Sequence, residues 1–109
     1  MENCVFCDVI SGNLPATKLY EDERVIVIKD IHPVAEFHVL AIPKDHVDDF
    51  HNVRVSETHL ALINALNKMI EDKGLMGKGY RIETNGGGAQ IVDHLHMHLI
   101  SPFATQDKA

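Results

Sequence analysis

A segment near the C-terminus, Asp93 to Pro102, reads DHLHMHLISP and alternates histidine with large apolar residues. Side chains of a β-strand point alternately to its two faces, so this period of two predicts a strand with one face in a hydrophobic core. Three histidines would then stand in a row on the other face. The segment therefore requires a sheet that buries one side and presents imidazoles on the other.

The rest of the chain predicts an α+β fold. Apolar residues at helical period indicate a long helix over about 57–73, with Ser56 as its N-cap and Gly74 after its end. A short helix over about 4–11 ends before the helix breaker Gly12. Strands around one long helix, with short connections, predict a mostly antiparallel five-stranded sheet. The expected strands span residues 17–23, 24–30, 37–43, 79–85 and 93–102.

Composition and charge exclude several classes of protein. The 109 residues, 45% of them hydrophobic and 24% charged, predict a single folded domain over 1–109. A net charge of -6 without a basic cluster argues against a nucleic-acid partner, although a small anionic ligand remains compatible. Neither a membrane span nor a signal peptide is expected, so we predict a cytoplasmic protein with no membrane partner.

The chain has two cysteines, Cys4 and Cys7, in a C-x-x-C motif. Cysteines this close rarely form a structural disulfide framework, and a reduced pair fits better. One helical turn separates them, so both sulfurs can face one point. A thioredoxin-like redox motif follows a strand, and none is expected before Cys4. The pair is therefore predicted to be free or to bind a metal with two further ligands.

The histidine row allows three interpretations, which are a solvated strand face, a metal site and covalent catalysis. The outer pair would lie about 13 Å apart at the β-carbons, whereas an imidazole and its metal bond reach about 5–6 Å. All three histidines therefore cannot share one metal. Neutral imidazole is also a nucleophile near neutral pH, and neighbouring imidazoles can bind phosphoryl oxygens. His38 and Asn85 are candidates to join them.

The segment HLHMHLI resembles the signature of the histidine triad family. CVFCDVISGNLPATKLYEDERVIVIKDIHPVAEFHVLAIPKDH, GYRIETN and GAQIVDHLHMHL extend the resemblance to its Hint-like branch, over about residues 4–100. The resemblance implies a homodimer in which two five-stranded sheets join into one of ten strands. It also implies binding of purine nucleotides (AMP or GMP conjugates) and hydrolysis of nucleoside phosphoramidates, related conjugates or dinucleoside polyphosphates.

The resemblance also assigns roles to individual residues. His96 matches the nucleophile that takes the nucleotidyl group as a phosphohistidine, His98 matches a ligand of an α-phosphate oxygen, and His38 helps orient the nucleophile. Nucleotidyltransferase relatives carry glutamine in place of His98, so this residue favours hydrolysis over transfer. The matches to nucleotide-binding positions are Asn85 at the phosphate, Gln90 in the loop near phosphate and leaving group, Asp30 at the ribose, and Phe6, Val9, Ile28 and Ile31 around the base.

Two further features follow from the resemblance. Many bacterial members bind structural zinc in a closed Cys₂His₂ site, which would take His94 out of the chemistry. In contrast, Ile91 stands where Hint-type hydrolases usually carry serine near the leaving group. A module that binds nucleoside monophosphates without catalysis therefore remains an alternative to the hydrolase. The matching zinc ligands are Cys4, Cys7, His46 and His94.

Overall fold

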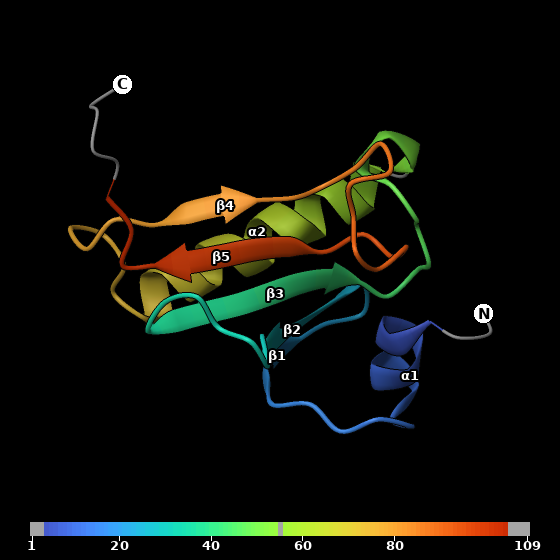
Figure 1. Ribbon diagram of the computed structural model, residues 1–109, viewed down its shortest axis with the longest axis horizontal. Helices are drawn as coiled ribbons and strands as arrows, with labels where there is room; N and C mark the ends of the chain where they lie inside the picture. Colours follow the sequence, from blue (N-terminus) through green and yellow to red (C-terminus); the bar gives the residue numbers. More distant parts are fainter. Residues whose placement is uncertain (1–3, 55, 105–109) are drawn as a thin grey trace.

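The computed structural model describes residues 4–54 and 56–104 (Figure 1). Two α-helices, one 3₁₀ helix and five strands account for the elements of this part of the chain. This composition confirms the predicted α+β class. In chain order the elements are α1 (Val5–Ser11), β1 (Lys18–Glu21), β2 (Val25–Lys29), β3 (Phe37–Pro43), η1 (Phe50–Asn52), α2 (Ser56–Asp72), β4 (Arg81–Glu83) and β5 (Met97–Ser101).

The strands form one sheet in the order β1-β2-β3-β5-β4, and each neighbouring pair is antiparallel. The predicted five-stranded sheet is thus confirmed, and the long helical connection produces no parallel pair among these strands. β5, the last strand along the chain, inserts between β3 and β4. The sheet therefore places the histidine segment beside β3 and leaves β4 at one edge.

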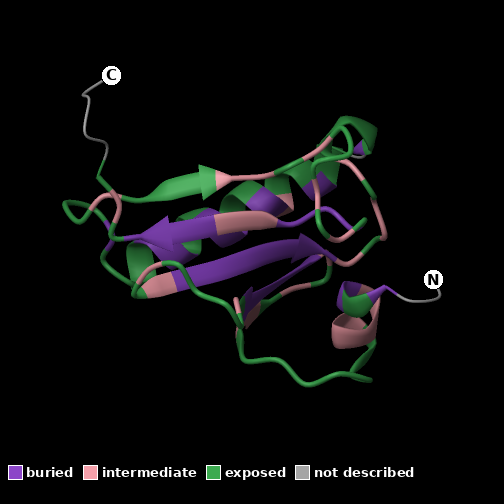
Figure 2. Ribbon diagram, in the orientation of Figure 1, coloured by how far each residue is buried: buried purple, intermediate pink, exposed green. Residues whose placement is uncertain are grey.

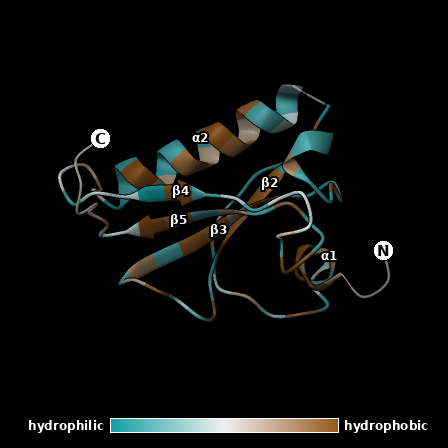
Figure 3. Ribbon diagram, turned by 45° about the horizontal axis from the view of Figure 1, so that its top comes forward, coloured by the Kyte–Doolittle hydropathy of each residue, from teal (hydrophilic) through white to brown (hydrophobic). Residues whose placement is uncertain are grey.

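The central strands are buried on both faces, which explains their continuous apolar sequence. Val25 and Val27 of β2 belong to a core cluster with α2, whereas Ile26 and Ile28 point to a second cluster with Phe6 of α1. Figure 2 shows β2 and most of β3 as buried, and Figure 3 shows α2 and α1 on opposite sides of the sheet. Of the two sheet faces, α2 thus covers one and the α1 region approaches the other.

The helices begin and end close to the predicted positions. The α2 helix starts at Ser56, one residue earlier than expected, and ends where Gly74 takes a left-handed φ of 62°. Beyond it the N–H of Leu75 donates to the carbonyl of Ile70, which satisfies a helix-end acceptor. In the same way α1 ends at Gly12, with φ 87°. Within the described residues, neither helix combines the length and apolar character that a membrane crossing requires.

The predicted extent of the last two strands is wrong. β5 begins only at Met97, so His94 and His96 precede the strand, and β4 has three residues where seven were expected. The physical reason is that hydrogen bonds outside the sheet ladder hold the approach to β5. The N–H of Leu95 donates to the carbonyl of Val47 at 2.6 Å, outside the sheet. The expected alternation of faces nevertheless holds, because Leu95 joins Leu99 in the α2 cluster.

Candidate functional site

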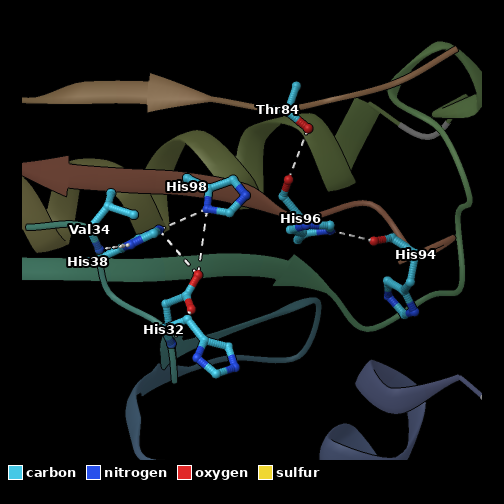
Figure 4. Close-up of polar contacts among 8 residues, drawn as sticks. His32, Val34, His38, Thr84, His94, His96 and His98 are labelled. Atoms are coloured by element: carbon cyan, nitrogen blue, oxygen red, sulfur yellow. Dashed lines mark hydrogen bonds and ion pairs between the residues drawn. The ribbon is translucent and has the colours of Figure 1, made fainter. Parts of the chain in front are cut away.

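Two of the predicted histidines meet on the sheet face opposite α2. In the register of β3 and β5, Leu40 pairs with His98 and His38 pairs with Ile100, so the two histidines are diagonal neighbours. Nε2 of His38 lies 2.8 Å from Nδ1 of His98 (Figure 4). Residues 60 positions apart in the sequence are thereby joined directly.

A backbone donor fixes which nitrogen of each imidazole carries the proton. The N–H of Val34 donates to Nδ1 of His38 at 3.2 Å, so neutral His38 carries its proton on Nε2. That proton is donated to Nδ1 of His98. Neutral His98 must then carry its own proton on Nε2. The chain of bonds therefore leaves His98 with an N–H that it can offer to a ligand oxygen.

The carboxylate of Asp30 lies beside this histidine pair. Its Oδ2 is 3.3 Å from Nε2 of His38 and 3.8 Å from Nδ1 of His98, and its Oδ1 accepts the N–H of His32. The three side chains are close enough to form a metal site by distance alone. However, the proton on Nε2 of His38 points into this space, and a protonated nitrogen cannot ligate a metal. Asp30 is instead placed to stabilise positive charge on the pair.

His96 presents a free lone pair to the same face. Its Nδ1 lies 2.8 Å from the carbonyl of His94, so Nδ1 carries the proton and Nε2 is unprotonated. The ring packs 5.0 Å from the ring of Phe6 and 5.1 Å from that of His98, between centroids. Thr84 donates from its hydroxyl to the carbonyl of His96 at 2.9 Å. No sequence signal pointed to Thr84, because its role depends on β4 lying beside β5.

Two cysteines and two histidines form a second cluster next to the first. Sγ of Cys4 lies 3.3 Å from Nδ1 of His94, and Sγ of Cys7 lies 3.3 Å from Nδ1 of His46. Nε2 of His94 donates to the carbonyl of Pro43 at 2.8 Å, so its Nδ1 lone pair faces the sulfurs. The four ligand atoms lie within 4.8 Å of one another. This cluster can hold a metal ion.

The protonation of this cluster depends on whether a cation is present. Burial lowers the pKa of His94, which keeps the imidazole neutral, the form that binds a metal. Burial, helped by the neighbouring Cys4, raises the pKa of Cys7 to about 11. A bound cation reverses this effect by stabilising the thiolates. In the absence of a cation, Cys7 is therefore a neutral thiol at neutral pH.

The structure gathers some of the predicted nucleotide contacts and separates others. Phe6, Val9 and Ile28 pack in or against one cluster on the site's face of the sheet. Ile31 is 84% exposed and lies outside that cluster, as does Ile91 at 97%. Asn85 is also exposed, directly after Thr84. Of the four apolar residues predicted to surround a base, the three from α1 and β2 therefore lie together, and Ile31 lies apart from them.

Comparisons with known proteins agree with this geometry. The family model described as scavenger mRNA decapping enzyme C-term binding matches residues 3–108. The solved structure of a HIT family hydrolase from Clostridium thermocellum is 49% identical and superposes with a TM-score of 0.85, over 92% of this chain and 90% of that one. A histidine triad protein from Clostridium difficile, 34% identical, covers 100% and 98% with a TM-score of 0.87.

A characterised relative is also similar in sequence. Adenosine 5'-monophosphoramidase of Candida albicans is 39% identical over 106 residues, which are 90% of this chain and 69% of the relative. These similarities agree with the fold and with the paired histidines on β3 and β5. The chain belongs to the histidine triad (HIT) family.

The buried histidine pair predicts a loss of stability in mild acid. Burial lowers the pKa of His98, and the neighbouring imidazoles of His96 and His38 lower it further. The unfolded chain takes up this proton near pH 6.5, before the folded protein does. The stabilisation from neutral His98 is therefore complete above about pH 6.5 and is lost as the pH falls through the folded-state pKa. Unfolding free energies at about pH 7 and about pH 5 measure this loss.

Two glutamine variants separate this effect from other titrations. His98→Gln keeps an acceptor for the proton of His38 but cannot be protonated, so its stability should vary less with pH. His59→Gln, which changes an exposed histidine of α2, should behave as the wild type. An equal pH dependence in wild type and His98→Gln would show that the pair does not carry the effect.

Proposed function

We propose that the protein hydrolyses purine nucleoside phosphoramidates, or related nucleoside monophosphate conjugates such as dinucleoside polyphosphates, through a nucleotidyl group carried on His96. The observation that carries the proposal is the pattern of imidazole protons. On one face, His96 offers an Nε2 lone pair and His98 offers an Nε2–H. The name of the Candida albicans relative, an adenosine 5'-monophosphoramidase, supports the same chemistry.

The proposed reaction has two steps. In the first, Nε2 of His96 attacks the α-phosphorus, the bond from phosphorus to the substrate nitrogen breaks, and the leaving amine takes up a proton from solvent. In the second, water attacks the phosphorus and gives up a proton to solvent, the bond to His96 breaks and restores its Nε2 lone pair, and the nucleoside monophosphate leaves. The N–H of His98 donates to a non-bridging oxygen, whose negative charge grows as the nucleophile attacks.

The neighbouring residues prepare these groups. His38 donates to Nδ1 of His98 and so directs the other proton of His98 toward the phosphate. Phe6 lies against His96, and together with Val9 and Ile28 it supplies apolar surface for a purine. The remaining contacts are carried over from the family resemblance as predictions: Asp30 at the ribose, Asn85 at the phosphate, Gln90 near the leaving group and Ile31 at the base.

The nucleophile can be tested with a single substitution. We expect His96→Ala to lower turnover of adenosine phosphoramidate by about a thousandfold or more, because the covalent route is lost. Rapid quenching and mass spectrometry should detect a nucleotidyl adduct on His96 in the wild type only. His59→Ala, on the exposed side of α2, serves as the matched control. Undiminished turnover by the His96→Ala protein would contradict the mechanism.

One observation favours a second candidate, a module that binds nucleoside monophosphates without turnover. The family resemblance places a serine near the leaving group, but here the position is Ile91, which is 97% exposed. Isoleucine can neither donate to a leaving amine nor protonate it. Tight binding of AMP, with no turnover of any phosphoramidate or dinucleoside polyphosphate, would favour this function over hydrolysis.

We also propose that the Cys₂His₂ cluster binds zinc, the metal that this ligand set favours. The bond from Nε2 of His94 to the carbonyl of Pro43 supports this, because it holds Nδ1 in the form and direction of a ligand. Zinc in a closed site of this kind stabilises the fold. Here it would join α1 to the sheet through four residues: Cys4, Cys7, His46 and His94.

Removal of the metal should lower stability rather than block the chemistry. We expect a chelator to lower the Tm of the zinc-loaded protein by about 5 °C or more, because binding energy in a structural site is folding energy. A Cys4→Ser variant should melt lower and respond little to the chelator. If chelation abolished turnover and left the Tm unchanged, the metal would be catalytic and a structural role would be wrong.

The homodimer is proposed as well. In the sheet of the described residues β4 is an edge strand, and its Ile82 is 41% exposed. Pairing of two such edges would continue the sheet into a second copy and cover unpaired main-chain groups. Sedimentation equilibrium at twice the monomer mass would support this arrangement, and a monomer would contradict it. The cytoplasmic location likewise stays a prediction from the sequence.

A further inference from the structure

Asp49 fastens the glycine loop at residues 86–88 to the segment that follows β3. Its Oδ2 accepts the N–H of Gly87 at 2.8 Å, and its Oδ1 accepts the N–H of His51 at 3.1 Å. A Cβ at position 86 would lie 2.7 Å from Oδ1 of Asp49, closer than side-chain carbons approach. Glycine at position 86 therefore permits this contact, which uses both carboxylate oxygens.

Gln90 provides a second fastening in the same place. Its Oε1 accepts the N–H of Gly88 at 2.9 Å, and its Nε2 donates to the carbonyl of Asp48 at 2.9 Å. The amides of Gly87 and Gly88 are thus bonded within the protein. Because these N–H groups already have acceptors, they do not form a cradle for phosphate. The loop can therefore affect the site only through the adjacent residues that it keeps in position.

The neighbour of most interest is Asn85, which lies between two fixed points. On one side Thr84 is bonded to the carbonyl of His96, and on the other Gly87 is bonded to Asp49. In Figure 1 the chain after β4 continues past the tip of that strand and turns near the green segment that precedes α2. The position of Asn85 relative to His96 therefore depends on both anchors. The anchor at Thr84 lies beside the sheet, whereas the anchor at Asp49 lies outside it.

We propose that Asp49 is a positioning residue for nucleotidyl transfer. It holds the glycine loop, and through that loop it keeps Asn85 where this side chain can contact the phosphate that His96 attacks. Asp49 itself does not touch the substrate. The inference rests on the proposed function, since it assigns Asn85 to the phosphate, and it adds a residue to which no role in the reaction has been assigned.

The test is a double-mutant cycle in the full-length, metal-loaded protein, with adenosine phosphoramidate as substrate. Asp49→Ala removes the acceptor of Gly87, and Gly86→Ala displaces the carboxylate with a methyl group. Each should lower kcat about tenfold, with KM changed by less than about threefold, because the reacting geometry is lost while binding persists. The double variant should be no slower than Asp49→Ala, because the added methyl group then has nothing to displace.

Asp48→Ala is the matched control. It removes the same charge from the adjacent residue, whose carboxylate bonds Asn52 and not the loop. Its kcat should stay within about twofold of wild type. The proposal is overturned if Asp49→Ala keeps wild-type kcat, or if Asp48→Ala is as slow as Asp49→Ala. It is also overturned if the double variant is slower by the product of the Asp49→Ala and Gly86→Ala effects.

A measurement without substrate separates this inference from the proposed function. Hydrogen exchange followed by NMR should show the Gly87 amide protected in the wild type and in Asp48→Ala, and exchanging at least about tenfold faster in Asp49→Ala. Equal exchange in all three proteins would show that the contact does not hold the loop. If the contact is confirmed but the wild type turns over no conjugate, the proposed function fails and the anchor stands as a structural feature only.

Discussion

The pairing of β3 with β5 is the interaction on which the site depends. It joins residues that are about sixty positions apart and puts His38 and His98 on one diagonal of the sheet. It also fixes where the chain must enter β5, and so where His96 stands. Since α2 fills the other face with apolar side chains, the polar groups are left on the face toward α1. A shift of one residue in this register would exchange the two faces and remove the site.

Three histidines at alternate positions have three different hydrogen-bonding arrangements, which depend on the partner of each ring. His94 donates to the carbonyl of Pro43 and turns its other nitrogen toward the cysteines. His96 donates to the carbonyl of His94 and keeps its Nε2 lone pair free. His98 accepts a hydrogen bond from His38 at Nδ1 and keeps an N–H on Nε2 for a ligand. One residue type thus supplies a candidate metal ligand, a candidate nucleophile and a hydrogen-bond donor, because each ring has a different fixed partner.

The segment from the end of β3 to η1 holds the chain that leads into β5. Along a short stretch it contributes the carbonyl of Pro43 to His94, the carbonyl of Val47 to Leu95, and the carboxylate of Asp49 to the glycine loop. These bonds replace strand pairing in the approach to β5, which is why β5 is shorter than its alternating sequence indicates. The stretch before the strand is held at several points, and the proposed nucleophile His96 is therefore positioned by contacts on both sides.

Much of this protein could be predicted from local patterns. Period-two alternation identified β5 and its faces, and the helical period with Gly74 located α2. The spacing of Cys4 and Cys7 predicted that both sulfurs can face one point. The family resemblance supplied the ligand set that the structure then gathers. Such features depend on residues that are neighbours in sequence, or on motifs long enough to be specific.

Other features were decided only by the tertiary structure. The proton on each imidazole depends on Val34, Pro43 and the carbonyl of His94, and a sequence shows no hydrogen-bond partner that comes from a distant backbone. The hydrogen bond of Thr84 and the proposed role of Asp49 arise in the same way, from segments brought together by β4 and η1. Composition and periodicity determined that the chain forms a sheet with a histidine face. The chemistry of each histidine was determined by the long-range contacts that fix its tautomer, because imidazole has two nitrogens and only its surroundings choose between them.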